Sequence, residues 1–212
     1  MIGRLVRRLA GPFEPALASA YRGFFFNIEA FADRIAALGR PQQVVEIGCG
    51  EGALACALLP RLPAARYVGI DISPRVGRLF QGSTERAQFI HGDATQLLSH
   101  LRARADLVLV CDVMHHADEA AREALWSVAA QLVEPLQGRL VLKEWVRNRT
   151  PIYHLGYLSD RYITGDRVRY QTRDHWLREA TQRGWGLRDE WSLKPWTANH
   201  ALVLAPPSAQ AV

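Results

Sequence analysis

The sequence predicts an α/β protein built on a seven-stranded, mostly parallel sheet with helices on both faces and a C-terminal antiparallel hairpin. Short β-branched runs alternate with helical patterns along the chain, which is typical of successive β–α–β units. Some runs, such as LVLV at 107–110, are wholly apolar, as in strands covered on both faces. The last two runs are separated only by KPWTA, which is too short for a parallel crossover and therefore indicates a hairpin.

The elements follow from these patterns in chain order. Thr172 has the side chain of a helix N-cap, and Pro74 after Ser73 fits the first position of a helix. The sequence predicts strands at 43–47, 66–71, 88–91, 106–111, 139–145, 186–193 and 199–204, and helices at 14–38, 52–61, 74–81, 94–103, 118–133 and 172–183. We expect a helical cap at 1–40, a main domain at 41–205 with an insertion at 147–171, and a frayed tail at 206–212.

Composition limits the classes of protein that fit. The chain has 212 residues, of which 49% are hydrophobic and 22% charged, as in a soluble single domain. No apolar run reaches the roughly 18 residues that a membrane span needs, and we expect no secretory leader. Three cysteines without a CxxC pair indicate a reducing cytoplasm, with neither a disulfide framework nor a metal site (Cys49, Cys56 and Cys111).

The net charge of +5 comes almost wholly from arginine. The arginine-rich segments lack a continuous basic stripe with interleaved aromatic rings, so nucleic acid is not favoured as a partner. At the N-terminus, apolar residues recur at helical spacing beside three arginines (Ile2, Leu5, Val6 and Leu9). Residues 1–10 therefore suit either weak contact with an anionic membrane surface or packing on their own domain.

The stretch VVEIGCGEG, residues 44–52, places three glycines directly behind a β-branched run. Such a turn lets the backbone pass very close to a ligand where a strand ends. Gly48, Gly50 and Ala53 also satisfy the dinucleotide pattern GxGxxG/A, and Asp71 follows about 20 residues later, where a ribose-binding acid would lie. However, the carboxylates of Glu46 and Glu51 would repel a pyrophosphate and favour a cofactor with a positively charged end.

From this turn onward the sequence resembles class I S-adenosylmethionine-dependent methyltransferases, with four motifs in order over residues 42–145. VVEIGCGEG resembles the first motif, YVGIDIS the second, FIHGDATQL the third and LVLVCDVMHHA the fourth. The terminal hairpin also fits the family. The resemblance implies the class I methyltransferase fold, with S-adenosylmethionine as the cofactor.

The matched motifs imply a set of cofactor-binding residues. Asp71 would take both ribose hydroxyls, Asp93 would accept from the adenine amino group, and Ala94 would offer its backbone N–H to the ring. Alternatively, Asp71 caps the helix at Pro74 and Asp93 caps the helix that follows it. The full predicted set is Glu46, Gly48, Cys49, Gly50, Asp71, Ile72, Asp93, Ala94, Asp112 and Val113.

The fourth motif also bears on what is methylated. It lacks the (N/D)PP(Y/F) signature of enzymes that methylate nucleobase amino groups, and its His115–His116 pair resembles small-molecule methyltransferases. Both histidines are candidate bases because histidine titrates near neutral pH, although such a pair can also merely shape the cofactor pocket. His154 is a third candidate base, and Glu144 at the end of the fifth predicted strand is a rival.

The insertion at 147–171 is longer than an ordinary connection and is predicted to be a lid or binding loop. Its tyrosines and arginines would suit a planar or apolar acceptor that carries an anionic group. Its candidate substrate-binding residues are Tyr153, Tyr157, Arg161 and Arg167. The alternative is a solvated helical hairpin that packs its tyrosines on the sheet edge.

These observations lead to a methyltransferase of a small or lipid-like acceptor, and we expect methylation at oxygen. A nicotinamide-dependent reductase is the first rival, but it would need a second substrate domain for which the chain has no room. A non-catalytic methyltransferase-like partner subunit is the second rival, but it would have no need of the glycine turn, Asp71 and Asp93. We expect a cytoplasmic location, with peripheral membrane contact as an option.

Overall fold

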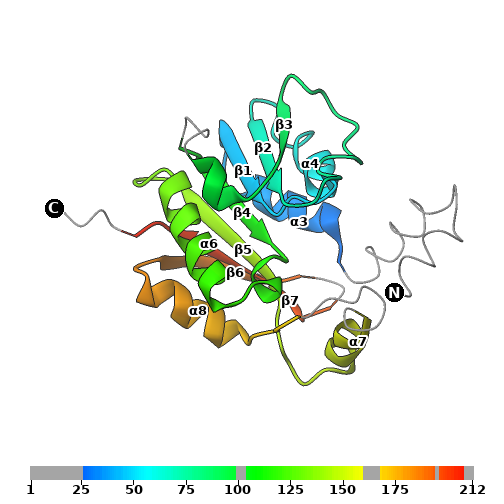
Figure 1. Ribbon diagram of the computed structural model, residues 1–212, viewed down its shortest axis with the longest axis vertical. Helices are drawn as coiled ribbons and strands as arrows, with labels where there is room; N and C mark the ends of the chain where they lie inside the picture. The colour runs from blue at the N-terminus through cyan, green and yellow to red at the C-terminus, as the bar shows by residue number, and fades with distance from the viewer. Residues whose placement is uncertain (1–25, 99–103, 160–167, 194–195, 208–212) are drawn as a thin grey trace, which may run out of the picture.

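The computed structural model describes residues 26–98, 104–159, 168–193 and 196–207. Its centre is a seven-stranded sheet in the order β3-β2-β1-β4-β5-β7-β6 (Figure 1). The strands are β1 Gln43–Ile47, β2 Arg66–Asp71, β3 Ala87–His91, β4 Leu107–Cys111, β5 Arg139–Trp145, β6 Gly186–Ser192 and β7 Asn199–Ala205. The first five are parallel, while β7 runs antiparallel to both β5 and β6. The predicted fold class and terminal hairpin are confirmed.

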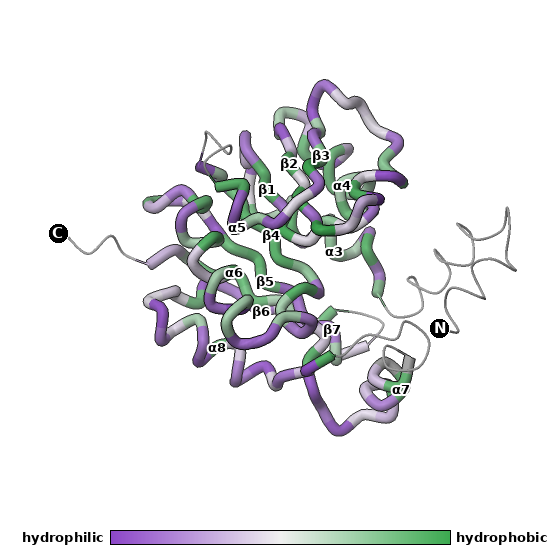
Figure 2. The backbone as a smooth tube through the Cα atoms, viewed as in Figure 1, coloured by the Kyte–Doolittle hydropathy of each residue, from purple (hydrophilic) through white to green (hydrophobic). Residues whose placement is uncertain are grey.

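Helices cover both faces of the sheet. Helices α3 (Ile28–Ala36) and α4 (Ala53–Leu58) pack on one face, and α6 (Glu119–Leu132) and α8 (Arg173–Gln182) pack on the other, as Figure 1 shows. The short helix α5 (Ala94–Leu97) lies beside α6. Each face has its own apolar core, because alternate residues of the central strands point to opposite sides. Figure 2 shows the central strands β4 and β5 as largely hydrophobic.

Two predicted helices differ from the structure. The predicted helix at 14–38 begins only at Ile28 within the described residues, because Asn27 is an extended N-cap whose side chain accepts from Ala30 N. Residues 74–79 form turns and residues 80–81 have no regular structure, so the helix predicted at 74–81 is wrong and Pro74 starts no helix. Gly77 has a φ of +69°, and its N–H donates to Gly50 O at 3.0 Å. The N–H groups of Gly77 and Leu79 thus donate to the glycine turn and not to carbonyls of a helix.

The other helices begin and end close to their predicted bounds. The Thr172 side chain accepts from His175 N, which confirms the predicted N-cap of α8. Of the helix predicted at 94–103, residues 94–97 form α5. Residues 99–103 lie outside the described part of the chain. The insertion at 147–171 contains the helix α7 (Pro151–Ser159), which the alternative of a helical hairpin allowed, and α7 projects from the body in Figure 1. Among the described residues no helix is both long and apolar enough to cross a bilayer.

Candidate active site

A cavity of about 830 Å³ opens at the carboxyl ends of the parallel strands. This is the position at which open α/β sheets bind ligands, and the volume suits a small molecule. Seven of the ten predicted cofactor residues line it, namely Gly48, Asp71, Ile72, Asp93, Ala94, Asp112 and Val113. The described lining carries four carboxylates, since Asp118 joins the three predicted acids, and no lysine or arginine. The cavity therefore favours a cationic ligand.

The glycine turn is held by backbone geometry that only glycine adopts without strain. Gly48, Gly50 and Gly52 have φ values of +76°, +52° and +87°. A Cβ on Gly48 would also lie 2.2 Å from a methyl carbon of Val113. Gly48 therefore lets the turn approach the loop after β4 because it lacks a side chain.

Asp71 stands at the end of β2, at the cavity wall. Its Oδ2 accepts from Gly50 N at 2.8 Å, and its Oδ1 accepts from Ser73 N at 2.7 Å. Asp71 does not cap a helix at Pro74, because no helix forms there. It ties the glycine turn to β2, and each carboxylate oxygen retains a second lone pair for a ligand.

Asp93 caps a helix, which is the alternative role that the sequence analysis gave it. Its Oδ1 accepts from Thr95 N and from Thr95 Oγ1, so it is the N-cap of α5. It also lines the cavity together with Ala94. Capping and ligand contact are compatible here, because the cap uses one carboxylate oxygen.

Glu46, Cys49 and Gly50, the other three predicted cofactor residues, are not part of the cavity lining. Glu46 is buried, and its Oε2 accepts a hydrogen bond from the Tyr67 hydroxyl. Burial raises the pKa of the Glu46 carboxyl to about 7, against the lowering effect of the Tyr67 hydrogen bond. Burial also raises the pKa of the Cys49 and Cys111 thiols, so neither is a reactive nucleophile.

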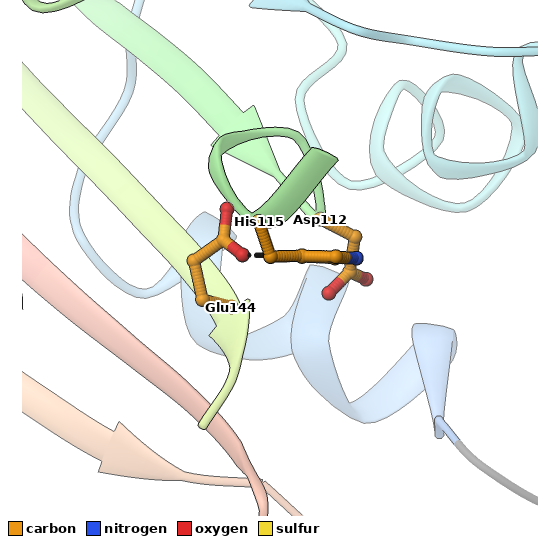
Figure 3. Close-up of side chains that lie close together, drawn as sticks. All are labelled: Asp112, His115 and Glu144. Carbon is orange, nitrogen blue, oxygen red and sulfur yellow. Dashed lines mark hydrogen bonds and ion pairs between the residues drawn. The ribbon is translucent and has the colours of Figure 1, made fainter. Parts of the chain in front are cut away.

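His115 and Glu144 form a buried pair beside the cavity. His115 Nδ1 lies 2.6 Å from Glu144 Oε2, and the two side chains are 5% and 1% exposed (Figure 3). Glu144 Oε1 accepts from Val113 N and Met114 N, at 3.1 and 2.8 Å. Glu144 therefore fixes both the loop after β4 and the orientation of the imidazole, which directs Nε2 away from the carboxylate.

Asp112 and Lys143 form a second pair across the same two strand ends. Lys143 Nζ lies 2.5 Å from Asp112 Oδ2, and Asp112 N donates to Lys143 O at 2.8 Å. The sequence reasoning did not identify Lys143. The available signal was a charged Lys-Glu pair inside the otherwise apolar run RLVLKEW of a central strand.

Asp112, His115 and Glu144 also have ligand atoms within 4.8 Å of one another, and Figure 3 shows their side chains converging. Two carboxylates and one imidazole can bind a divalent metal ion. In this cluster, however, the Glu144 oxygens already accept from two backbone N–H groups and approach His115, and the Lys143 ammonium contacts Asp112. The set favours a hydrogen-bonded dyad, because a cation would meet the ammonium of Lys143.

The remaining predicted residues are spread over the cavity and the insertion. His116 lines the cavity, and its ring centre lies 4.1 Å from that of His115. His154 is an exposed residue of α7. Arg161 and Arg167 lie outside the described residues.

Tyr153 and Tyr157 of α7 pack around Tyr170, at ring-centre distances of 5.9 and 6.4 Å. Tyr170 in turn lies 5.0 Å from the ring of His115. This aromatic cluster joins the insertion to the end of β5, where Trp145 contributes to the same apolar group. The structure thus packs the predicted substrate tyrosines on Tyr170, which contacts His115, and none of these tyrosines is part of the cavity lining.

The chain is similar in sequence to known methyltransferases. Residues 44–136 match a family model described as a methyltransferase domain. The chain is 27% identical over 195 residues to "Methyltransferase ungE'" from Aspergillus campestris (strain IBT 28561), which covers 82% of this chain and 52% of that protein. It is 31% identical over 126 residues to "Ribosomal RNA large subunit methyltransferase G" from Magnetococcus marinus, covering 55% and 31%. The chain thus spans about half of one relative and a third of the other.

Solved structures agree on the fold. The pyocyanin biosynthetic protein PhzM superposes with a TM-score of 0.71 at 20% identity, over 95% of this chain and 61% of that chain. The O-methyltransferase NcsB1 from neocarzinostatin biosynthesis was solved with S-adenosyl-L-homocysteine and 1,4-dihydroxy-2-naphthoic acid. It has a TM-score of 0.67 at 20% identity, over 93% and 58% of the two chains.

The sheet order, the cavity at the strand ends and these similarities define a class I methyltransferase fold. Residues 44–136 match the model of a methyltransferase-domain family, in agreement with the four sequence motifs.

Proposed function

We propose that the protein is an S-adenosylmethionine-dependent methyltransferase that acts on an oxygen atom of a small or lipid-like acceptor. The observation that carries this proposal is the buried His115–Glu144 pair beside an acidic cavity at the strand ends. The cavity would bind a cationic cofactor, and the pair would remove the proton of a hydroxyl group.

The residues around the cavity fit S-adenosylmethionine. Its sulfonium and ammonium groups match a lining that is rich in carboxylates. The same carboxylates would repel the pyrophosphate of a nicotinamide dinucleotide. Asp71 would hold the ribose hydroxyls, and Asp93 with Ala94 would hold the adenine. When bound, S-adenosylmethionine supplies the methyl group and a sulfur leaving group for in-line displacement.

His115 is the proposed general base. Its Nδ1–H donates to Glu144, so Nε2 carries the lone pair that accepts the acceptor's hydroxyl proton. Glu144 then stabilises the imidazolium by its adjacent negative charge. The acceptor oxygen, freed of its proton, forms the new bond to the methyl carbon.

The aromatic cluster around His115 indicates a planar acceptor. Tyr153, Tyr157 and Tyr170 offer ring faces and edges on the insertion side of the site. The naphthoic acid bound to NcsB1 has the same character, with fused rings, hydroxyls and a carboxylate. Arg161 and Arg167 are proposed to bind such an anionic group through the planar guanidinium, which lysine lacks.

The first experiment measures cofactor binding and methyl transfer. We expect calorimetry to detect S-adenosylmethionine and S-adenosylhomocysteine, and mass spectrometry to detect labelled methyl groups on hydroxylated aromatic or lipid-like acceptors. A chelator should leave the rate unchanged. Binding of NAD(H) without binding of either sulfur cofactor would overturn the proposal, and transfer to ribosomal RNA alone would replace its acceptor.

The second experiment separates the candidate bases. A general base typically contributes about 10²–10⁴-fold to the rate. His115→Asn and Glu144→Gln should therefore lower kcat by at least about 10²-fold and leave cofactor affinity nearly unchanged. His116→Asn and His154→Asn test the other two candidates, and a comparable loss in either one alone would move the base to that residue.

A further inference from the structure

Lys143 is a buried cation in a central strand. Its side chain is 2% exposed, and its ammonium group lies 2.5 Å from Asp112 Oδ2 and 4.1 Å from the centre of the Phe26 ring. Burial of an ammonium group is unfavourable unless the charge is paired. An apolar side chain would fill this strand position at lower cost, so the charge itself needs an explanation.

Asp112, the partner of Lys143, is held in a strained conformation. Its φ is +56°, and it is the only non-glycine residue of the described ranges with a positive φ. Lys143 restrains it twice, because Lys143 O accepts from Asp112 N and Lys143 Nζ donates to the carboxylate. Strain of this kind persists where the surroundings over-determine it, and it is common at ligand sites.

Asp112 differs from the other three acids of the cavity lining because its carboxylate is held by a side-chain cation and not by backbone N–H groups. Asp93 and Asp118 are the N-caps of α5 and α6, and both oxygens of Asp71 accept from backbone N–H groups. Asp112 gives only Oδ2 to Lys143, and its side chain is 41% exposed at the cavity wall. Within the described part of the chain, its Oδ1 has no hydrogen-bond donor.

Asp112 and Asp71 also lie on opposite sides of the glycine turn. Asp112 follows β4 and Asp71 ends β2, with β1 between them in the sheet. A ligand that spans the cavity thus meets Asp112 at one end and Asp71 and Asp93 at the other. In S-adenosylmethionine the α-ammonium group and the adenosine are likewise at opposite ends.

We propose that Lys143 is a positioning residue that fixes Asp112 so that Oδ1 accepts a hydrogen bond from the α-ammonium group of the cofactor. This inference rests on the proposed use of S-adenosylmethionine. Lys143 does not contact the ligand. It holds one carboxylate oxygen and the backbone of Asp112, which leaves the other oxygen of this cavity-lining residue for the ligand.

The test compares two ligands that differ in the amino-acid part. S-adenosylhomocysteine carries the α-ammonium group, and 5′-methylthioadenosine lacks it. Calorimetry on Lys143→Met and Asp112→Asn should show affinity for S-adenosylhomocysteine falling by about tenfold or more, as expected for a charge-assisted bond. Affinity for 5′-methylthioadenosine should change by less than about twofold. The double variant should lose no more than either single variant, because both changes break one interaction.

Arg183→Met is the matched control, since Arg183 pairs with Glu123 on the α6–α8 side and neither residue lines the cavity. It should leave both affinities unchanged. Equal losses for the two ligands, or no loss for S-adenosylhomocysteine, would refute the role of Lys143. If Lys143→Met does not fold, the partly exposed Asp112→Asn decides the question by the same comparison. Failure of the parent protein to bind S-adenosylhomocysteine would instead refute the proposed function.

Discussion

At the scale of single residues, Glu46 is a buried carboxyl whose protonation is coupled to folding. It is 3% exposed, and burial raises its pKa from 4.5 to about 7. The folded state therefore binds a proton more tightly than the unfolded state does. This contribution to stability is fully present below the unfolded pKa and is lost as the pH rises through about 7.

We expect Glu46→Gln to remove this pH dependence. Glutamine keeps an oxygen that accepts from the Tyr67 hydroxyl but cannot ionise. Between pH 4.5 and pH 7 the parent should lose on the order of 3 kcal/mol of unfolding free energy relative to the variant. Urea denaturation at several pH values measures this difference. A constant difference between parent and variant over that range would show that Glu46 does not titrate there.

At the scale of elements, residues 74–81 show how a tertiary contact overrides a helical pattern. Gly77 N donates to Gly50 O, and Leu79 N donates to Glu51 O at 2.8 Å. Arg78 adds an ion pair with the Glu51 carboxylate at 3.0 Å. The segment therefore supports the glycine turn from behind, and Gly77 allows it to pass close to the ring of Phe89.

Gly77→Ala should destabilise the protein and weaken cofactor binding together. A Cβ at Gly77 would lie 2.4 Å from Phe89 Cγ, and its φ of +69° costs an L residue roughly 1–2 kcal/mol. Gly186→Ala is the control, because a Cβ there meets nothing closer than 3.9 Å. Thermal denaturation and S-adenosylhomocysteine titration measure both effects. Normal cofactor affinity in a destabilised Gly77→Ala would show that the segment does not support the turn.

At the scale of the whole molecule, the cavity joins the carboxyl ends of several strands, so a ligand there couples to global stability. A ligand that binds only the folded state stabilises it by RT ln(1 + [L]/Kd), or about 2.7 kcal/mol at a hundredfold excess over Kd. We expect S-adenosylhomocysteine to raise the melting temperature and NAD(H) to leave it unchanged. Differential scanning fluorimetry with both ligands measures this. A rise with NAD(H) alone would favour the reductase.

The sequence by itself determined the strands and the place of the cofactor cavity. β1, β2 and β5 have their predicted bounds, because short apolar β-branched runs between turn residues have few alternatives. The hairpin of β6 and β7 could be predicted from the length of the connection between them, since five residues are too few for a parallel crossover. Gly48, Asp71, Asp93 and Asp112 lie at the cavity because carboxyl ends of parallel strands share one edge.

Only the tertiary structure decided which charged groups pair. Glu144 with His115, Lys143 with Asp112 and Tyr67 with Glu46 are each 21 to 31 positions apart in sequence. No local pattern specifies such pairs, because strand register and burial bring the side chains together. The same reason explains why residues 74–81 form no helix and why Glu46 lies outside the cavity: the competing partners come from other strands.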